Sequence, residues 1–257
     1  MRATPTHPFL DHRRPLAIAH RGGGLEAEEN TLPAFMRAVG LGFTHVELDV
    51  HASADGQVVV HHDDTLQRMF DDPRKLGALP WAELQGLRTR GDAGLPLMAE
   101  VLESFPGLNV AIEAKSDEVV APLADLLARM KVLDRVCVGA FAPSRTRRLR
   151  AALGPGLCWS PAHAGVARLW LAGWGLPVLA AGRFPVVQVP THFKGLAVVT
   201  PRMLRAAHGR GIQVQVWTVD AETEMERLLD MGVDAIMTDR PTLLREVMRR
   251  RGLWRGA

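Results

Sequence analysis

Three carboxylates in this sequence alternate with aliphatic residues, a spacing that can gather acidic side chains on one face of a sheet. Residues 45–50 read HVELDV, and residues 109–115 read NVAIEAK. Because successive side chains of a strand point to opposite faces, Glu47 and Asp49 share a face, and Glu113 is separated from its aliphatic neighbours in the same way. Three such carboxylates in one confined space repel one another and lose solvation unless a cation compensates them.

The residue types favour a hard divalent cation at this position. Carboxylate oxygens suit Mg²⁺ or Ca²⁺, with Mn²⁺ as a further candidate, whereas zinc prefers nitrogen and sulfur ligands. Cys137 and Cys158 stand alone in apolar surroundings, so we interpret them as buried thiols rather than as zinc ligands or a disulfide. The alternative for the acidic residues is a solvent-facing edge of an antiparallel sheet, which the parallel pattern of the neighbouring strands argues against.

Side chains suited to proton transfer and phosphate binding lie beside the same segments. His20 and Arg21 end an apolar segment and precede three glycines, where backbone can approach a phosphate closely. Lys115 closes the segment that carries the third carboxylate, and the adjacent His61 and His62 cannot be told apart by spacing. We interpret five other histidines as structural: His7, His12, His45, His163 and His208.

The strands and helices that position these side chains can be predicted from the sequence, because short apolar segments alternate with longer amphipathic ones. This alternation is typical of repeated β–α units around a parallel sheet. We expect eight strands, at residues 16–20, 45–50, 109–114, 135–139, 157–160, 186–189, 213–218 and 234–238. We expect the clearest helices at residues 31–39, 98–104, 118–130, 201–208, 221–229 and 241–249. This order predicts an α/β fold of the (β/α)8 TIM-barrel type, whose reactive groups gather at the carboxyl ends of the strands.

The domain organisation follows from length and from one long connection. A chain of 257 residues suits one barrel, so we assign residues 1–257 to a single catalytic domain. Residues 51–96 are too long for one β–α connection and contain an additional apolar strand at 58–61, which predicts a small insertion after the second strand. Residues 1–14 lack the apolar core of a signal peptide, which predicts a cytoplasmic protein.

Composition and charge narrow the choice of partners. The formal net charge is +3 and Tyr is absent, and scattered basic residues without interleaved aromatic side chains argue against nucleic-acid binding. Residues 169–182, with Trp170 and Trp174, and the tail 249–255, with Trp254, could contact a membrane surface. We favour instead a core or dimer-contact helix and a solvated tail. The oligomeric state is left open.

Ordered motifs along the chain resemble those of the glycerophosphodiester phosphodiesterase family. They are HRG at 20–22, ENTLPAF at 29–35, ELDV at 47–50, DG at 55–56, HD at 62–63, IEAK at 112–115, VWTV at 216–219 and GVDAIMTDRP at 232–241. The resemblance extends from near residue 16 to near residue 243. It implies a (β/α)8 barrel that hydrolyses glycerophosphodiesters to glycerol 3-phosphate and an alcohol with the help of a divalent metal.

The same resemblance implies a role for each site residue. It assigns metal binding to Glu47, Asp49 and Glu113, acid and base catalysis to His20 and His62, and substrate binding to Arg21, Lys115 and Trp217. The His–Asp pair selects His62 over His61. Trp217 is either a wall for the alcohol portion of the substrate or core packing, and Glu29 is explained almost as well by a helix cap.

Two alternative functions remain open. The same site could release the head group of a lysophospholipid, as phospholipase D-like relatives do, or the barrel could bind a phosphorylated metabolite without catalysis. The alcohol on the substrate is also open. So is the attacking group, which is either the glycerol 2-hydroxyl, forming a cyclic phosphate, or water.

Overall fold

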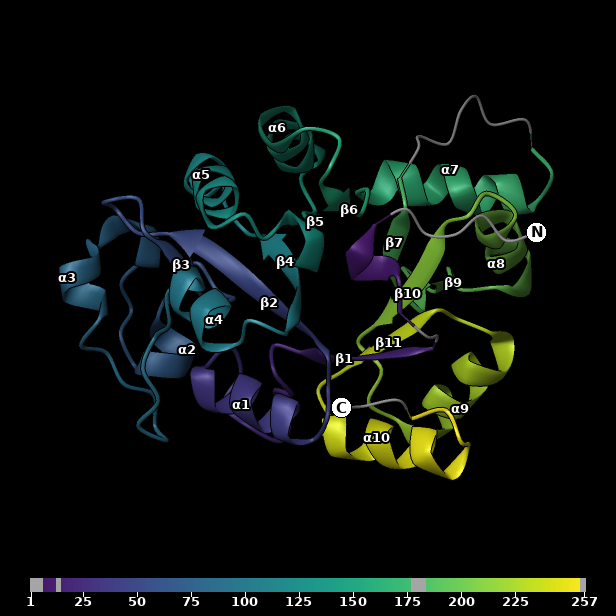
Figure 1. Ribbon diagram of the computed structural model, residues 1–257, viewed down its shortest axis with the longest axis horizontal. Helices are drawn as coiled ribbons and strands as arrows, with labels where there is room; N and C mark the ends of the chain where they lie inside the picture. The colour runs from purple at the N-terminus through teal and green to yellow at the C-terminus, as the bar shows by residue number, and fades with distance from the viewer. Residues whose placement is uncertain (1–6, 13–14, 177–183, 255–257) are drawn as a thin grey trace.

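The computed structural model describes residues 7–12, 15–176 and 184–254. Eight parallel strands form the barrel wall: β1 (Leu16–His20), β2 (His45–Ala52), β4 (Asn109–Ala114), β5 (Val136–Gly139), β6 (Cys158–Trp159), β7 (Val186–Pro190), β10 (Gln213–Trp217) and β11 (Ala235–Thr238). Hydrogen bonds join them in the order β6-β5-β4-β2-β1-β11-β10-β7 (Figure 1). The predicted (β/α)8 barrel is therefore confirmed, and all eight expected strands are present.

The ring of strands is nearly closed, with one seam between β6 and β7. Among the described residues no backbone ladder joins these two strands. Instead, the Gln188 backbone N–H on β7 donates a hydrogen bond of 2.9 Å to Ser160 Oγ, just after β6. A side chain therefore replaces the backbone pairing at this one place in the wall.

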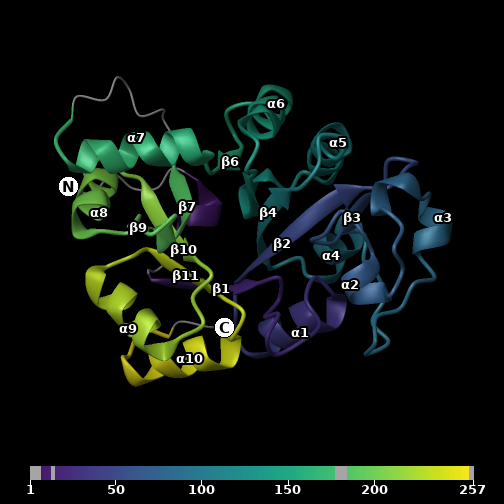
Figure 2. The same cartoon turned by 180° about the vertical axis from the view of Figure 1, so that it is seen from behind.

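Helices follow the strands and cover the outside of the barrel, as the two opposite views in Figures 1 and 2 show. They are α1 (Leu32–Gly40), α4 (Met98–Ser104), α5 (Val120–Met130), α6 (Pro143–Leu153), α7 (His163–Gly173), α8 (Pro201–His208), α9 (Glu222–Met231) and α10 (Pro241–Arg250). Helix α6 was not expected from the sequence, because its seam is thin and only Thr146 and Leu149 are buried in an otherwise polar, basic segment.

The connection after β2 contains the expected insertion. Strand β3 (Val58–Val60) pairs antiparallel with the end of β2, and the short helices α2 (Gln67–Phe70) and α3 (Trp81–Leu84) follow. This segment has its own apolar cluster, formed by Val59, Leu66, Leu76, Leu79, Leu84 and Leu95. Figure 1 places it at one end of the molecule, beside α1 and α4.

The two faces of β2 and β4 serve different purposes. Val46 and Leu48 of β2 and Ile112 of β4 pack in the main apolar core. Because β2 lies between β1 and β4 in the sheet, the alternative of a solvent-facing edge for its carboxylates is wrong.

A second, smaller apolar cluster contains both cysteines. It is formed by Phe9, Leu10, Ala111, Cys137, Cys158 and Val186. Both cysteines are buried free thiols, as interpreted from the sequence.

The structure describes only part of the two segments considered for membrane contact. Helix α7 ends at Gly173, and residues 177–182 of the first segment lie outside the described residues. The Trp254 ring packs edge-to-face against Phe43 with 5.2 Å between ring centroids, so this part of the tail covers the core rather than extending into solvent; Arg255 lies outside the described residues. Within the described ranges, no helix has both the length and the apolar composition that crossing a bilayer requires.

Candidate active site

The register of three neighbouring strands brings the acidic side chains together. Glu47 on β2 pairs with His20 on β1, and Asp49 pairs with Glu113 on β4. One carboxylate oxygen from each of Glu47, Asp49 and Glu113 lies within 4.8 Å of the other two. All three stand toward the carboxyl ends of their strands, where a barrel of this type presents reactive groups.

The surroundings of Glu47 and Glu113 disfavour the ionised forms of these two carboxylates. Burial, together with the nearby Asp49, raises the pKa of Glu47 to about 8. Burial also raises the pKa of Glu113. Lys115 Nζ offers partial compensation, because it lies 3.2 Å from Glu113 and 3.5 Å from Asp49. A set of oxygen donors with this excess negative charge fits a hard divalent cation, which would restore the ionised forms.

His20 is held at the edge of this acidic cluster by a residue from the other end of the chain. Its Nδ1 lies 2.8 Å from Asp239 Oδ1, and its Nε2 lies 3.6 Å from Glu47 Oε2. Burial by itself would lower the pKa of His20, but the carboxylates of Glu47 and Asp239 outweigh it and raise the pKa to about 9. Sequence reasoning placed Asp239 at the carboxyl end of the eighth strand, within the motif at 232–241, but gave it no part in catalysis. The available signal was its place directly after the eighth strand, which pairs with the first.

Arg21 adopts a left-handed backbone conformation, with φ of 52°, which directs its side chain toward two acidic residues. Its Nη1 donates to Glu29 at 3.0 Å, and its Nε lies 3.1 Å from Asp49. The following Gly22 has φ of 83°, and a Cβ there would come within 2.8 Å of Ala34 Cβ. Among the described residues, the buried Nε–H of Arg21 finds no acceptor in hydrogen-bonding geometry. The contact with Asp49 is therefore an ion pair without a directed hydrogen bond.

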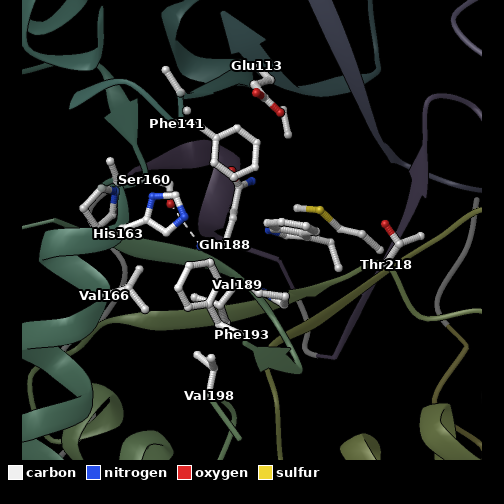
Figure 3. A pocket seen from close by; sticks show the side chains of 18 of the residues that line it. Glu113, Phe141, Ser160, His163, Val166, Gln188, Val189, Phe193, Val198 and Thr218 are labelled. Atoms are coloured by element: carbon white, nitrogen blue, oxygen red, sulfur yellow. Dashed lines mark hydrogen bonds between the residues drawn. The ribbon is translucent and has the colours of Figure 1, made fainter. Parts of the chain in front are cut away.

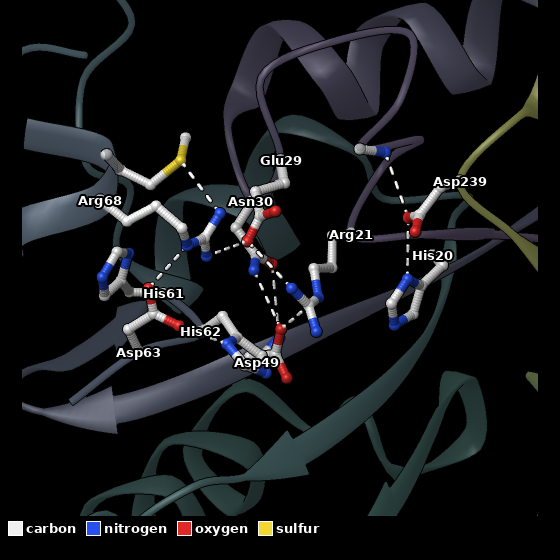
Figure 4. Close-up of polar contacts among 12 residues, drawn as sticks. His20, Arg21, Glu29, Asn30, Asp49, His61, His62, Asp63, Arg68 and Asp239 are labelled. Carbon is white, nitrogen blue, oxygen red and sulfur yellow. Dashed lines mark hydrogen bonds and ion pairs between the residues drawn. The ribbon is translucent and has the colours of Figure 1, made fainter. Parts of the chain in front are cut away.

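The two adjacent histidines have different surroundings, as Figure 4 shows. His62 lines the cavity that contains Glu113, and its Nδ1 lies 2.6 Å from Asp63 Oδ1. His61 is 3% exposed and lies 3.0 Å from the Thr65 carbonyl oxygen through Nε2. The structure therefore brings His62, and not His61, to the acidic cluster.

A chain of ion pairs connects His62 to Arg21 through the insertion. Arg68 Nε lies 2.7 Å from Asp63 Oδ2, and Arg68 Nη2 lies 2.7 Å from Glu29 Oε1 (Figure 4). Burial opposes ionisation of Glu29, but Arg68 and Arg21 outweigh it and lower its pKa. Sequence reasoning assigned Arg68 no contact with the site, because nothing in the local pattern indicates that the insertion folds back onto residue 29.

Trp217 and the residues around it extend the site into a cavity of about 580 Å³ (Figure 3). Trp217 lines this cavity and also packs against an apolar cluster that includes Leu16 and Ile18. Its ring lies 5.9 Å from that of Phe141, at 89°. His163, which we expected to be structural, lies in the cavity wall instead.

The sequence matches known phosphodiesterases over nearly its whole length. Residues 20–243 match the model of the glycerophosphoryl diester phosphodiesterase family. The chain is 35% identical to a probable glycerophosphodiester phosphodiesterase 2 of Mycobacterium tuberculosis, over 98% of each protein. It is also 27% identical to a lysophospholipase D of Rattus norvegicus, over 94% of this chain and 90% of that relative.

Solved structures share the fold. A putative glycerophosphoryl diester phosphodiesterase of Silicibacter pomeroyi is similar with a TM-score of 0.80 and 23% identity, over 96% of this chain and 99% of that one. A phosphodiesterase of Oleispira antarctica, solved in complex with the product sn-glycerol-3-phosphate, has a TM-score of 0.77 and 24% identity, over 91% of this chain and 97% of that one.

Proposed function

Since the chain belongs to the glycerophosphoryl diester phosphodiesterase family, and is thereby a phosphodiester hydrolase, we propose that it releases glycerol 3-phosphate and an alcohol from glycerophosphodiesters in a metal-dependent reaction. The observation that carries this proposal is the arrangement of three carboxylates and two aspartate-bound histidines around one cavity. The glycerol 3-phosphate bound as product by the Oleispira antarctica phosphodiesterase supports the same substrate class.

Glu47, Asp49 and Glu113 would hold the cation, which we expect to be Mg²⁺ or Ca²⁺, with Mn²⁺ as a further candidate. When bound, a divalent cation at this position supplies Lewis-acid stabilisation of charge on the phosphate oxygens. Lys115 and Arg21 would add positive charge beside the same oxygens. Both side chains line the cavity beside the carboxylates, and charged donors of this kind bind phosphate oxygens strongly.

His20 and His62 would carry the protons. Each has its Nδ1 bound to an aspartate, Asp239 or Asp63, which fixes the orientation of the ring and leaves Nε2 to act toward the substrate. One histidine would take the proton from the attacking hydroxyl, and the other would protonate the departing alcohol. With a glycerol 2-hydroxyl as the attacking group, the product of the first step is a five-membered cyclic phosphate, which water then opens with the two roles reversed.

The function is tested by following glycerol 3-phosphate release from glycerophosphocholine, glycerophosphoethanolamine and glycerophosphoglycerol with Mg²⁺, Ca²⁺ and Mn²⁺ in turn. We expect turnover with at least one diester and one metal. An analogue with hydrogen at the glycerol 2-position should bind without turnover if the cyclic route is followed, and should be hydrolysed if water attacks directly. Tight binding of all the diesters with no release under any metal would favour a non-catalytic barrel and overturn the proposal.

The ion pairs of Arg68 predict a positioning role for this residue. Arg68→Gln removes the partner that holds Asp63, so His62 loses its fixed orientation, and we expect kcat to fall by roughly tenfold to hundredfold with a smaller change in KM. Arg90→Gln is the matched control, because Arg90 lies in the same insertion, is 77% exposed and pairs with Asp71 away from the site. Equal kcat values for the two variants would show that Arg68 does not position His62.

A second candidate substrate class is the lysophospholipids. Most of the residues that line the cavity are apolar, and the Rattus norvegicus relative is a lysophospholipase D. The catalytic groups would be the same, because the head group of a lysophospholipid is joined to its glycerol through the same kind of phosphodiester.

A further inference from the structure

Charge is distributed unevenly along this chain. Residues 135–219, one third of the sequence, contain eleven Lys and Arg residues and neither Asp nor Glu. The rest of the chain holds all 28 acidic residues and twenty of the 31 basic ones, so it is net acidic. The acid-free segment runs from just before β5 to just after β10, and its helices α6, α7 and α8 follow one another around the barrel (Figures 1 and 2). One sector of the barrel is therefore strongly positive.

The same sector exposes most of the large apolar side chains on the described surface. Nine large apolar side chains are exposed among the described residues, and six of them lie within residues 135–219. These six are Phe141, Leu171, Trp174, Leu176, Phe193 and Leu196. All except Phe141 lie at the end of α7, just after it, or on the hairpin of β8 (His192–Phe193) and β9 (Leu196–Ala197). Exposed hydrocarbon and positive charge thus share one part of the surface.

Contacts among three elements hold these side chains in one surface. The Trp170 indole N–H donates a hydrogen bond of 3.0 Å to the Ala197 carbonyl oxygen, which fixes the hairpin against α7. The rings of Trp170 and Trp174 lie 5.5 Å apart between centroids. The start of α8 packs closely on the end of α7, because a Cβ at Gly173 would lie 3.0 Å from the Arg202 carbonyl group. We call the following residues the α7–hairpin surface: Leu171, Trp174, Phe193, Lys194, Leu196 and Arg202.

The positive groups of this surface stand beside its aromatic rings. Arg202 Cζ lies 4.2 Å from the centre of the Trp174 ring, and Lys194 Nζ lies 5.7 Å from that of Phe193. Neither basic side chain has a carboxylate partner within the part of the chain that the structure describes. The protein therefore leaves these charges uncompensated next to exposed hydrocarbon.

This combination of side chains favours a lipid bilayer over other occupants. Aromatic and aliphatic side chains beside Lys and Arg are typical of surfaces that lie in the interface of an anionic membrane. A second copy of the chain would place the same positive surface against itself in a two-fold dimer, which charge repulsion disfavours. The sequence alone favoured a core or dimer-contact helix at this position, but the exposure of Leu171 and Trp174 and the charge around them favour lipid.

We propose that the protein binds peripherally to membranes that contain anionic lipids, with the α7–hairpin surface against the lipid head groups. Figure 1 places α7 and α8 at one end of the molecule and the insertion at the other. The net-acidic rest of the chain then faces the water, because a negative membrane surface repels it. The inference does not depend on the proposed hydrolase function.

Sedimentation of the full chain with sucrose-loaded vesicles tests the proposal. We expect vesicles of phosphatidylcholine mixed with phosphatidylglycerol to be bound at least about tenfold more tightly than vesicles of phosphatidylcholine alone, because each basic side chain at an anionic surface contributes roughly a fivefold gain. Binding should weaken as NaCl is raised, since salt screens exposed charges. No binding to the mixed vesicles at low salt, or equal binding to both kinds, would overturn the proposal.

Two variants that remove apolar groups locate the contact. Leu196→Ser and Trp174→Ser should each weaken binding to the mixed vesicles by about tenfold, because each removes a large apolar group from the lipid interface. Met36→Ser on α1 is the matched control and should bind like the wild type, since Met36 is 64% exposed and Leu196 is 66% exposed. Leu196 lies on an exposed hairpin, so its variant keeps the test valid if Trp174→Ser fails to fold.

Two further variants test the charges. Lys194→Gln and Arg202→Gln should each weaken binding to the mixed vesicles by roughly fivefold, whereas Arg90→Gln in the insertion, where the side chain is 77% exposed, should not. Equal binding by all the surface variants and their controls would overturn the location of the contact. A dimer in solution that Leu196→Ser converts to a monomer would identify the surface as a subunit interface instead. Tighter binding of a single-stranded oligonucleotide than of the mixed vesicles would likewise overturn the proposal.

Discussion

Removal of the divalent cation should abolish turnover, and removal of one carboxylate that would hold it should have nearly the same effect. We expect Glu47→Gln and Asp49→Asn each to lower kcat by roughly 10³-fold or more, because a bound cation contributes several kcal/mol to stabilising the transition state. Chelation of the wild-type protein should be reversible on adding Mg²⁺, Ca²⁺ or Mn²⁺. Glu103→Gln, on the exposed surface of α4, serves as the control for loss of a carboxylate elsewhere.

Thermal unfolding gives a readout that does not depend on turnover. The metal-free wild type holds three mutually repelling carboxylates, so its Tm should rise when the cation is added, since a ligand that binds only the folded state stabilises it. Glu47→Gln and Asp49→Asn should unfold at an equal or higher Tm than the wild type without metal, and should lose the metal-induced rise. Full activity in a metal-stripped sample, or a normal metal-induced rise in both variants, would contradict the assigned ligands.

Loss of either of the two histidines proposed to carry protons is the second large effect that we expect. His20→Ala and His62→Ala should each lower kcat by about 10²–10⁴-fold, the usual range for loss of a positioned acid or base. KM should change less, because the phosphate would be held mainly by Arg21, Lys115 and the cation.

His61→Ala is the matched control for His62→Ala. His61 is buried and bound to a backbone carbonyl, so its loss should lower Tm while the kcat of the folded protein stays near the wild-type value. Steady-state kinetics and thermal unfolding of the three variants provide the comparison. A severe loss of kcat in His61→Ala, with a mild effect in His62→Ala, would show that the wrong member of the pair has been assigned.

The order of the strands could be predicted from sequence because each strand is a short apolar segment followed by a helix. The same periodicity indicated which face of β2 carries Glu47 and Asp49. It could not decide between His61 and His62, since that choice depends on how the insertion folds back. Asp239 is 219 residues from His20, and only the closure of the barrel through β1 and β11 brings the two together.

The cavity wall was the least predictable part of the site. Phe141 lies in the connection before α6, a helix whose basic composition conceals its thin apolar seam. The sequence around His163 does not distinguish it from a structural histidine. Its neighbours Phe141 and Phe193 come from different β–α units. Contacts among residues from separate connections leave no trace in local periodicity, so they require the folded arrangement.

Among the described residues, β6 and β7 share no backbone ladder, so the barrel wall is open at this one junction. In the part of the chain that the structure describes, the hydrogen bond of Gln188 with Ser160 joins β6 to β7 where other neighbouring strands share a backbone ladder, so fewer hydrogen bonds resist a change of strand separation at this junction. Both residues line the cavity. The carboxylates proposed to bind the metal lie on β2 and β4, each of which is paired with a strand on both sides. The backbone ladders that fix the separation of these strands are thus continuous at the acidic cluster, and the junction without a ladder lies elsewhere in the wall of the same cavity.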